Sequence, residues 1–283
     1  MTVDQIARNV ADGGRVNAAE ALELYRRAPT ALLGQLADGI RVRKHPERVV
    51  TYIIDRNVNY TNLCVARCNF CAFYRTVGSS DGYVLGFEEI YRKIEETIEL
   101  GGNQLLLQGG HNPDLPIQWY EDLFRGVKAR FPEFKLHALS PPEVLHISRI
   151  NKVPVPQVIE RLVAAGLDSV PGGGAEILVD RVRHLLNCYT KASADEWIDV
   201  MREAQRAGLR TTATMMYGHV ETEEERIEHL MRLRRLQDET GGFTAFITWS
   251  FQPTNTELGT HEEASVEATG IDYLRTISTS SMQ

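Results

Sequence analysis

The 283-residue chain has few cysteines, no block of basic residues and no long apolar run. A membrane-spanning helix needs about 20 consecutive apolar residues, so no membrane segment is expected. The first residues lack the basic start and apolar stretch of a secretory signal, so no signal peptide is expected either. The net charge of −7, from 31 Lys and Arg against 38 Asp and Glu, argues against nucleic acid as the main partner.

Three of the four cysteines, Cys64, Cys68 and Cys71, lie within eight residues of one another, while Cys188 stands alone. A secreted protein would spread its cysteines to form disulfides, whereas three thiols in one short loop cannot all pair. This pattern favours a metal site in a reducing compartment, and the chain is expected to be cytoplasmic. Cys188 has no neighbour in the sequence that would stabilise a thiolate, so it is expected to be buried.

Short apolar runs alternate with segments of helical periodicity along the chain. We expect strands at residues 49–54, 104–108, 135–139, 167–170, 211–217 and 243–251. Two of the expected helices open with capping boxes, Ser193 with Glu196 and Thr222 with Glu225. Such alternation is typical of parallel βαβ units, and no dinucleotide-binding glycine motif follows the first strand. The sequence therefore predicts an α/β fold, a (β/α)6 partial TIM-type barrel.

The chain divides into three expected parts. Residues 1–45 predict an N-terminal helical extension, residues 46–275 the barrel core, and residues 276–283 a frayed tail rich in Ser and Thr. The last helix is expected to begin at Ser265. Because the tail has too few apolar residues for another strand and helix, we expect a truncated barrel that is open on one side, with an incomplete pocket and poor activity.

Polar and glycine-rich segments follow the expected strands at their carboxyl ends. These segments are the cysteine loop and residues 108–111, 140–143, 172–176, 217–219 and 252–253. In α/β barrels the active site lies at this end of the strands. The segments are therefore expected to meet at one rim and to form the functional site.

The number of clustered thiols restricts the metal chemistry. A structural zinc site takes four ligands, usually from two separated pairs, and a fully ligated [4Fe–4S] cluster takes four thiolates. Three thiolates leave one iron open to a substrate or cofactor, which indicates catalysis. A non-enzymatic iron–sulfur or zinc-binding barrel protein is the alternative from another functional class.

The segment Cys64-Val-Ala-Arg-Cys68-Asn-Phe-Cys71, after the first expected strand, resembles the signature of the radical S-adenosylmethionine (SAM) superfamily. The resemblance implies that the three cysteines hold a [4Fe–4S] cluster. It also implies that the amino and carboxylate groups of SAM chelate the fourth iron. The aromatic ring of Phe70 would then lie against the cofactor, although core packing explains this ring equally well.

Further motifs extend the resemblance over roughly residues 45–275. Asn57-Val-Asn-Tyr-Thr-Asn62 and Phe73-Tyr-Arg75 are similar to the branch that contains menaquinone-futalosine and deazaflavin synthases. Within this branch, residues 108–116, 140–143 and 171–177 most resemble the dehypoxanthine futalosine cyclase family. The aminofutalosine synthases and the deazaflavin-forming enzymes of the same branch remain alternatives.

The resemblance implies a radical enzyme that cyclises dehypoxanthine futalosine in menaquinone biosynthesis. A 5′-deoxyadenosyl radical formed from SAM would abstract a ribose hydrogen from the substrate. The resulting carbon radical would add to the aromatic ring of the substrate, followed by loss of an electron and a proton. The implied partners are this small molecule and an electron donor such as flavodoxin or ferredoxin.

The resemblance also implies cofactor-binding residues. Gly109 and Gly110 correspond to the backbone that the methionine end of SAM approaches, and Glu176 corresponds to a ribose contact. Gly218 and Glu221 resemble the adenine-side motif. Each position also has a structural explanation, since glycines end strands and a carboxylate stabilises a helix N-terminus.

The final proton of the implied reaction needs a base. The sequence offers five unranked candidates: His111, Glu143, Glu176, Tyr217 and His219. His111 has the alternative of a hydrogen bond to Asp114 within a turn. Glu143 forms a capping box with Ser140, which explains its presence without catalysis.

Overall fold

The computed structural model describes residues 1–261, 264 and 267–282. In this part of the chain, six parallel strands form one sheet in sequence order, each strand paired with the next. The strands are β1 (Asp55–Asn59), β2 (Gln104–Gln108), β3 (Lys135–Ala138), β4 (Ser169–Val170), β5 (Arg210–Tyr217) and β6 (Phe243–Ser250). The predicted α/β partial barrel with six strands is therefore confirmed.

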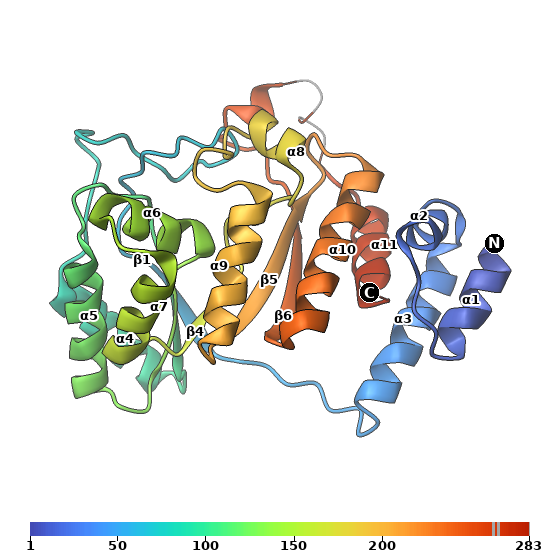
Figure 1. Ribbon diagram of the computed structural model, residues 1–283, viewed down its shortest axis with the longest axis horizontal. Coiled ribbons are helices and arrows are strands. Elements are labelled where there is room, and N and C mark those ends of the chain that lie inside the picture. Colours follow the sequence, from blue (N-terminus) through green and yellow to red (C-terminus); the bar gives the residue numbers. More distant parts are fainter. Residues whose placement is uncertain (262–263, 265–266, 283) are drawn as a thin grey trace.

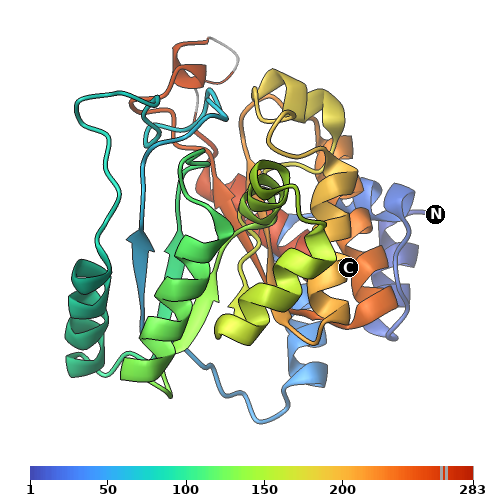
Figure 2. The ribbon, with the colours of Figure 1, turned by 60° about the vertical axis from the view of Figure 1, so that its left-hand side comes forward.

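Helices connect the strands and cover one face of the sheet (Figures 1 and 2). They are α4 (Phe87–Glu99), α5 (Ile117–Arg130), α6 (Pro141–Asn151), α7 (Val155–Ala165), α8 (Asp180–Leu185), α9 (Ala194–Arg206), α10 (Glu223–Thr240) and α11 (Gly270–Ser281). Both predicted capping boxes form, at the starts of α9 and α10. Three further helices precede the sheet: α1 (Val3–Ala11), α2 (Ala18–Arg27) and α3 (Thr30–Lys44). Figure 1 shows these three helices beside α10 and α11.

The two faces of the sheet differ in character because alternate strand residues point to opposite sides. Leu105, Leu107, Leu136 and Ala138 are fully buried on the outer face, where they pack against helices α4, α5 and α7. Residues between them in sequence point to the other side, which we call the inner face. The space that this inner face curves around is called the lumen below.

The first strand does not lie where the sequence predicts it. Residues 49–54 are exposed and belong to no strand, with Val50 at 83% and Tyr52 at 86% exposure, and the Ile54 carbonyl accepts a bond from the Asn103 amide. Pairing with β2 begins at Asp55, and it places Asn57 beside Leu106. The apolar run has higher strand propensity than Asp55–Asn59, but the residues that meet β2 decide the strand.

The expectation of a frayed tail at residues 276–283 is also wrong for the described residues. Helix α11 continues to Ser281 and packs against α3. Thr276 is buried, and its hydroxyl lies 3.2 Å from the Tyr25 hydroxyl. The Ser280 hydroxyl donates to the Thr276 carbonyl, so a polar residue is accommodated within the helix. The helix begins after its N-cap at Thr269, and the expected start at Ser265 lies outside the described residues.

Candidate active site

The cysteine loop follows β1 directly and lies over the carboxyl end of the sheet. The Cys64 amide donates to the Arg75 carbonyl at 2.9 Å, and the Val65 amide donates to the His111 carbonyl at 3.2 Å. The first bond closes the loop on itself, and the second fastens it to the segment that follows β2. All three thiols are free: Cys68 is buried, whereas Cys64 and Cys71 are partly exposed.

The arrangement of the thiols distinguishes between kinds of metal site. Within the described ranges, no three His, Cys, Asp or Glu side chains converge closely enough to hold one metal ion. In an iron–sulfur cluster each cysteine binds a different iron, so its thiols do not converge on a single point. Three free thiols on one short loop therefore fit a [4Fe–4S] cluster, with one iron left open, better than a single zinc ion.

A buried ion pair lies beside the cysteine loop. Nζ of Lys191 is 2.6 Å from Oε1 of Glu176 and 5.3 Å from the centre of the Phe70 ring. Burial raises the pKa of Glu176, but the attraction of Lys191 outweighs it and lowers the pKa below its ordinary value. Burial also raises the pKa of the Cys68 thiol to about 12, although Lys191 opposes this shift. A charged pair thus stands next to the thiols and Phe70.

The sequence does not predict Lys191 as a site residue, because this lysine belongs to none of the expected rim segments. Arg183 explains how it reaches the site. This fully buried guanidinium donates to the Ala175 carbonyl at 2.7 Å and to the Ala192 carbonyl at 2.7 Å. It therefore holds the segment containing Glu176 against the segment containing Lys191. Glu176 itself has a positive φ of 42°, a conformation that costs free energy in a non-glycine residue.

Gly109 and Gly110 are required by close packing. A Cβ on Gly109 would lie 2.7 Å from Cζ of Tyr60, and a Cβ on Gly110 would collide with the Leu63 carbonyl. The absence of side chains lets the segment after β2 approach the cysteine loop. Both glycines are therefore explained by close packing after the end of β2.

Glu143 is fully engaged inside the protein. Its Oε1 accepts hydrogen bonds from the Tyr60 hydroxyl at 2.8 Å and the Gly109 amide at 3.0 Å. Its Oε2 accepts from the amide and hydroxyl of Ser140. Burial raises the pKa of Glu143. The capping interpretation is confirmed, and the same carboxylate also joins β1, the Gly109 segment and α6.

His111 does not form the expected bond with Asp114. Its ring stacks on the His146 ring with centroids 5.1 Å apart. Nε2 of His146 donates to the Asn112 carbonyl at 3.0 Å. Burial lowers the pKa of His111 well below its ordinary value, and Lys191 adds to this effect. The ring is therefore neutral near pH 7. The backbone carbonyl of His111 accepts from the Val65 amide, so this residue lies next to the cysteine loop.

The remaining candidates form a second cluster after β5. Glu221 accepts hydrogen bonds from the Gly218 and His219 amides and pairs with Arg226 at 2.6 Å. The side chains of His219 and Glu221 are completely buried. Burial raises the pKa of Glu221, but His219 and Arg226 lower it further, to about 2. Both ring nitrogens of His219 are engaged as well, with the Met216 carbonyl and the Val220 amide, so both side chains are fully occupied by protein groups.

Tyr217 points away from the lumen. It pairs with Ser250 on the same side of the sheet as Ala213, whose side chain belongs to the outer core. The Arg226 guanidinium lies 5.0 Å from its ring centre, and its hydroxyl has no partner among the described residues. Burial raises the pKa of Tyr217 to about 12. Tyr217 therefore does not face the lumen, and it lies beside the pair formed by Glu221 and Arg226.

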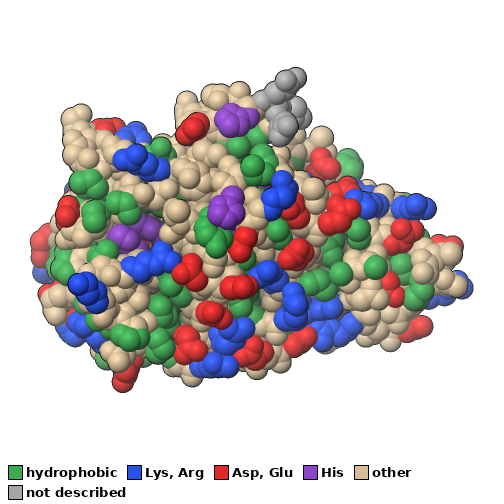
Figure 3. All heavy atoms as spheres, turned by 45° about the horizontal axis from the view of Figure 1, so that its top comes forward, with side chains coloured by type: hydrophobic (Ala, Val, Ile, Leu, Met, Phe, Trp, Pro, Cys, Tyr) green, Lys and Arg blue, Asp and Glu red, His purple; other side chains and the backbone are tan. Residues whose placement is uncertain are grey.

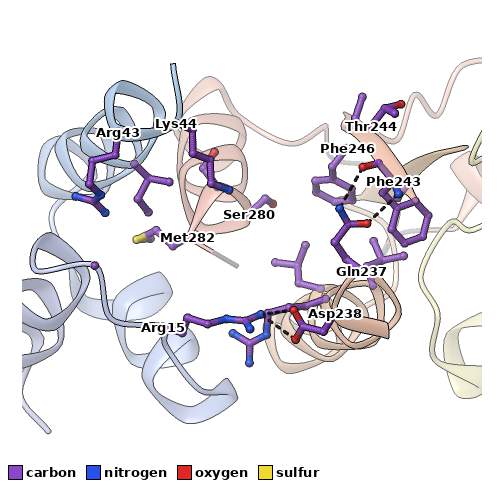
Figure 4. Close-up of a pocket in the computed structure, with 18 of the residues that line it drawn as sticks. Arg15, Arg43, Lys44, Gln237, Asp238, Phe243, Thr244, Phe246, Ser280 and Met282 are labelled. Atoms are coloured by element: carbon purple, nitrogen blue, oxygen red, sulfur yellow. Dashed lines mark hydrogen bonds and ion pairs between the residues drawn. The ribbon is translucent and has the colours of Figure 1, made fainter. Parts of the chain in front are cut away.

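A cavity of about 630 Å³ lies elsewhere, between the N-terminal helices, α10 and the start of β6 (Figure 4). Arg15 donates to Asp238 across its edge, and Gln237 bonds Phe243. The cavity faces the amino end of β6, away from the cysteine loop. On the face shown in Figure 3, acidic and basic side chains are interspersed.

A three-cysteine loop at the carboxyl end of a parallel half-barrel defines a class, the enzymes of the radical SAM superfamily. The profile described as the Radical SAM superfamily matches residues 58–233, and the chain belongs to this superfamily. Its enzymes use a [4Fe–4S] cluster and SAM. Among relatives, the chain is 44% identical over 280 residues to the cyclic dehypoxanthine futalosine synthase of Halalkalibacterium halodurans, covering 99% of this chain and 74% of the relative.

One further relative and one solved structure are also similar to the chain. It is 40% identical over 273 residues to the aminodeoxyfutalosine synthase of Thermus thermophilus, covering 96% of this chain and 73% of that relative. The solved structure of the FeFe-hydrogenase maturase HydG from Carboxydothermus hydrogenoformans matches with a TM-score of 0.76 and 15% identity. That match covers 98% of this chain but 62% of the solved chain, and it shows the fold alone. No helix among the described residues is both long and apolar enough to cross a membrane.

Proposed function

We propose that this radical SAM enzyme cyclises dehypoxanthine futalosine to its cyclic product, as a step in menaquinone biosynthesis. The observation that carries the proposal is the 44% identity to a cyclic dehypoxanthine futalosine synthase over 99% of the chain. The cysteine loop supports it, because its three free thiols fit a cluster with an open iron. A cytoplasmic location and an electron donor such as flavodoxin or ferredoxin belong to the same proposal.

Cys64, Cys68 and Cys71 would hold the cluster. When bound, cluster and cofactor supply a carbon-centred radical that abstracts hydrogen from the substrate. Lys191 and Glu176, which form a buried pair beside Phe70, offer opposite charges to the amino acid and hydroxyl groups of SAM. The Gly109 and Gly110 backbone lies against the loop, and the absence of side chains leaves room for the cofactor to approach it.

The remaining proposed roles follow from burial and accessibility. Gly218 and Glu221 form a rigid turn, and its backbone is proposed to lie beside the adenine of SAM. Glu143 and His219 are held by other protein groups, so they are proposed to shape the site. His111 stays a proposed base candidate because its carbonyl accepts from the Val65 amide of the cysteine loop and its ring stacks on the His146 ring.

An anaerobic product assay tests the proposed function. The reconstituted enzyme is incubated with SAM, a reductant and dehypoxanthine futalosine, and the products are identified by mass. The cyclase forms 5′-deoxyadenosine and a cyclic product that has two hydrogen atoms fewer than the substrate, since one leaves with the radical and one as a proton. A product that retains the adenosyl fragment would instead support the activity of the Thermus thermophilus relative. Zinc without acid-labile sulfide in the reconstituted protein would contradict both.

A further inference from the structure

The inner face of the sheet carries a strip of polar side chains that no role above uses. Leu105, Leu107, Leu136 and Ala138 point outward into the helical core, so their sequence neighbours point inward. All but one of the inward residues on β1 to β4 are polar or charged, the exception being Leu106; the others are Asp55, Asn57, Asn59, Gln104, Gln108, Lys135, His137 and Ser169. This strip lies below the rim that carries the cysteine loop.

His137 lies at the centre of the strip. It pairs with Leu106 on one side and with Ser169 on the other. Its Nδ1 lies 2.7 Å from the Ser169 hydroxyl. Its Nε2 makes no hydrogen bond with any described residue, and it is not among the buried polar atoms that lack a partner. One ring nitrogen is therefore fixed by the protein, while the other keeps contact with the lumen.

The wall formed by β5 and β6 has a different character. Met216, Ile247 and Trp249 alternate with outward residues and share the inner face. Ile247 is 44% exposed and Trp249 is 36% exposed. The lumen is thus mostly polar along β1 to β4, whereas β5 adds Thr212 and Thr214 beside Met216, and β6 is apolar with one aromatic ring. A ligand that combines an aromatic ring with hydroxyl groups matches both walls.

We propose that His137 determines substrate specificity by hydrogen-bonding an oxygen of the substrate through Nε2, with Ser169 fixing the ring. The inference rests on the proposed function, because dehypoxanthine futalosine carries both a ribose and an aromatic ring. Burial lowers the pKa of His137 to about 4, so the ring is neutral near pH 7. It therefore contributes a directional hydrogen bond and no charge.

A binding titration tests the role of His137. Dehypoxanthine futalosine is titrated into anaerobically reconstituted enzyme with SAM and without reductant, so that no turnover occurs and the Kd is measured. His137→Leu is expected to raise the Kd about tenfold, because a buried polar group of the substrate loses its partner. His137→Gln keeps a hydrogen-bond donor and is expected to raise the Kd about threefold. Cluster absorption and substrate-free SAM cleavage are expected to stay unchanged in both.

Two further variants separate binding from folding. Ser169→Ala removes the group that fixes the ring and is expected to raise the Kd about threefold. His45→Leu, at an exposed histidine just after α3, serves as the matched control and leaves the Kd unchanged. A wild-type Kd in His137→Leu overturns the proposal. If His137→Leu does not fold, a wild-type Kd in both His137→Gln and Ser169→Ala overturns it.

The product assay keeps this inference distinct from the proposed function. A wild-type enzyme that binds the substrate through His137 but forms another product contradicts the cyclase activity alone. A wild-type enzyme that cyclises the substrate with no dependence of the Kd on His137 contradicts this inference alone. A wild-type enzyme that neither binds nor converts dehypoxanthine futalosine contradicts both.

Discussion

At the scale of single residues, the four cysteines test the cluster assignment. Cys188 is fully buried and near enough to Cys68 for the two to interact electrostatically. Burial raises the pKa of Cys188 and of Cys68 alike, so the assignment of Cys68 and not Cys188 as a ligand rests on its place in the three-cysteine loop. Substituting Cys64, Cys68 or Cys71 by Ser is expected to abolish the visible absorption of the reconstituted cluster and the cleavage of SAM.

Cys188→Ser is the matched control, since it changes a neighbouring thiol by the same single atom. We expect it to retain the cluster absorption and SAM cleavage of the wild type. The measurements are iron and sulfide content, the visible spectrum and the yield of 5′-deoxyadenosine. Loss of the cluster in Cys188→Ser, or its retention in Cys68→Ser, would contradict the ligand assignment.

The site residues that could be predicted from the sequence are those that belong to a short local motif. The spacing of Cys64, Cys68 and Cys71 indicates a cluster without any structure. Lys191 and His137 carry no such signal, because their partners are brought together only by folding. Lys191 meets Glu176 through the carbonyl contacts of Arg183, and His137 meets Ser169 across two strands. Contacts between side chains that lie far apart in the sequence cannot be inferred from the spacing of residues.

At the scale of elements, the turn after β5 is held by a buried ion pair. Glu221 accepts from the Gly218 and His219 amides and pairs with Arg226, which also donates to the Tyr25 hydroxyl at 2.7 Å. Tyr25 belongs to α2. One chain of polar contacts therefore links the N-terminal helices to the rim, and removing its central carboxylate affects both.

The low pKa of Glu221, about 2, predicts a pH-dependent contribution to stability. Because its pKa is lower in the folded than in the unfolded protein, the contribution is present above the ordinary pKa of about 4.5 and is lost as the pH falls toward 2. We expect Glu221→Gln to be less stable than the wild type by about 3 kcal/mol at pH 7. At pH 3 this difference should narrow by about 2 kcal/mol.

Urea unfolding of the two proteins at pH 7 and pH 3 measures these differences, and comparison at each pH cancels the titration of the other carboxylates. Glu228→Gln is a suitable control, because the Glu228 side chain is 48% exposed on α10 and exposed ion pairs contribute little. An equal difference in the free energy of unfolding at both pH values would show that Glu221 is not stabilised in its charged form.

Element prediction succeeded where strand and helix propensity agree with the final pairing. β2 forms at residues 104–108 as expected, and α10 begins at its predicted capping box. The position predicted for the first strand was wrong because residues 49–54 have higher strand propensity than Asp55–Asn59, the residues that pair with β2. The prediction of a frayed tail was wrong because the Ser and Thr composition indicated disorder, whereas burial of Thr276 against α2 stabilises the end of α11.

At the scale of the whole molecule, the sheet is a half-barrel with two edge strands, β1 and β6. The inner face near β6 is accessible, since Ile247 is 44% exposed and Trp249 is 36% exposed. The other two tryptophans are less accessible: Trp197 is fully buried and Trp119 packs among aromatic rings. Quenching of tryptophan fluorescence by a dissolved quencher therefore reports mainly on Trp249, which lies on the open side of the lumen.

We expect acrylamide to quench part of the tryptophan emission of the wild type, and Trp249→Phe to lose most of the quenchable component. Trp119→Phe is the matched control and should retain it. Because Trp249 shares the inner face with Met216 and Ile247, a substrate in the lumen covers its ring. Dehypoxanthine futalosine added with SAM should therefore protect the wild type from quenching. Identical quenching of Trp249→Phe and the wild type would show that the open side of the lumen is covered in solution. Quenching of the wild type that persists with bound substrate would place the substrate away from β6.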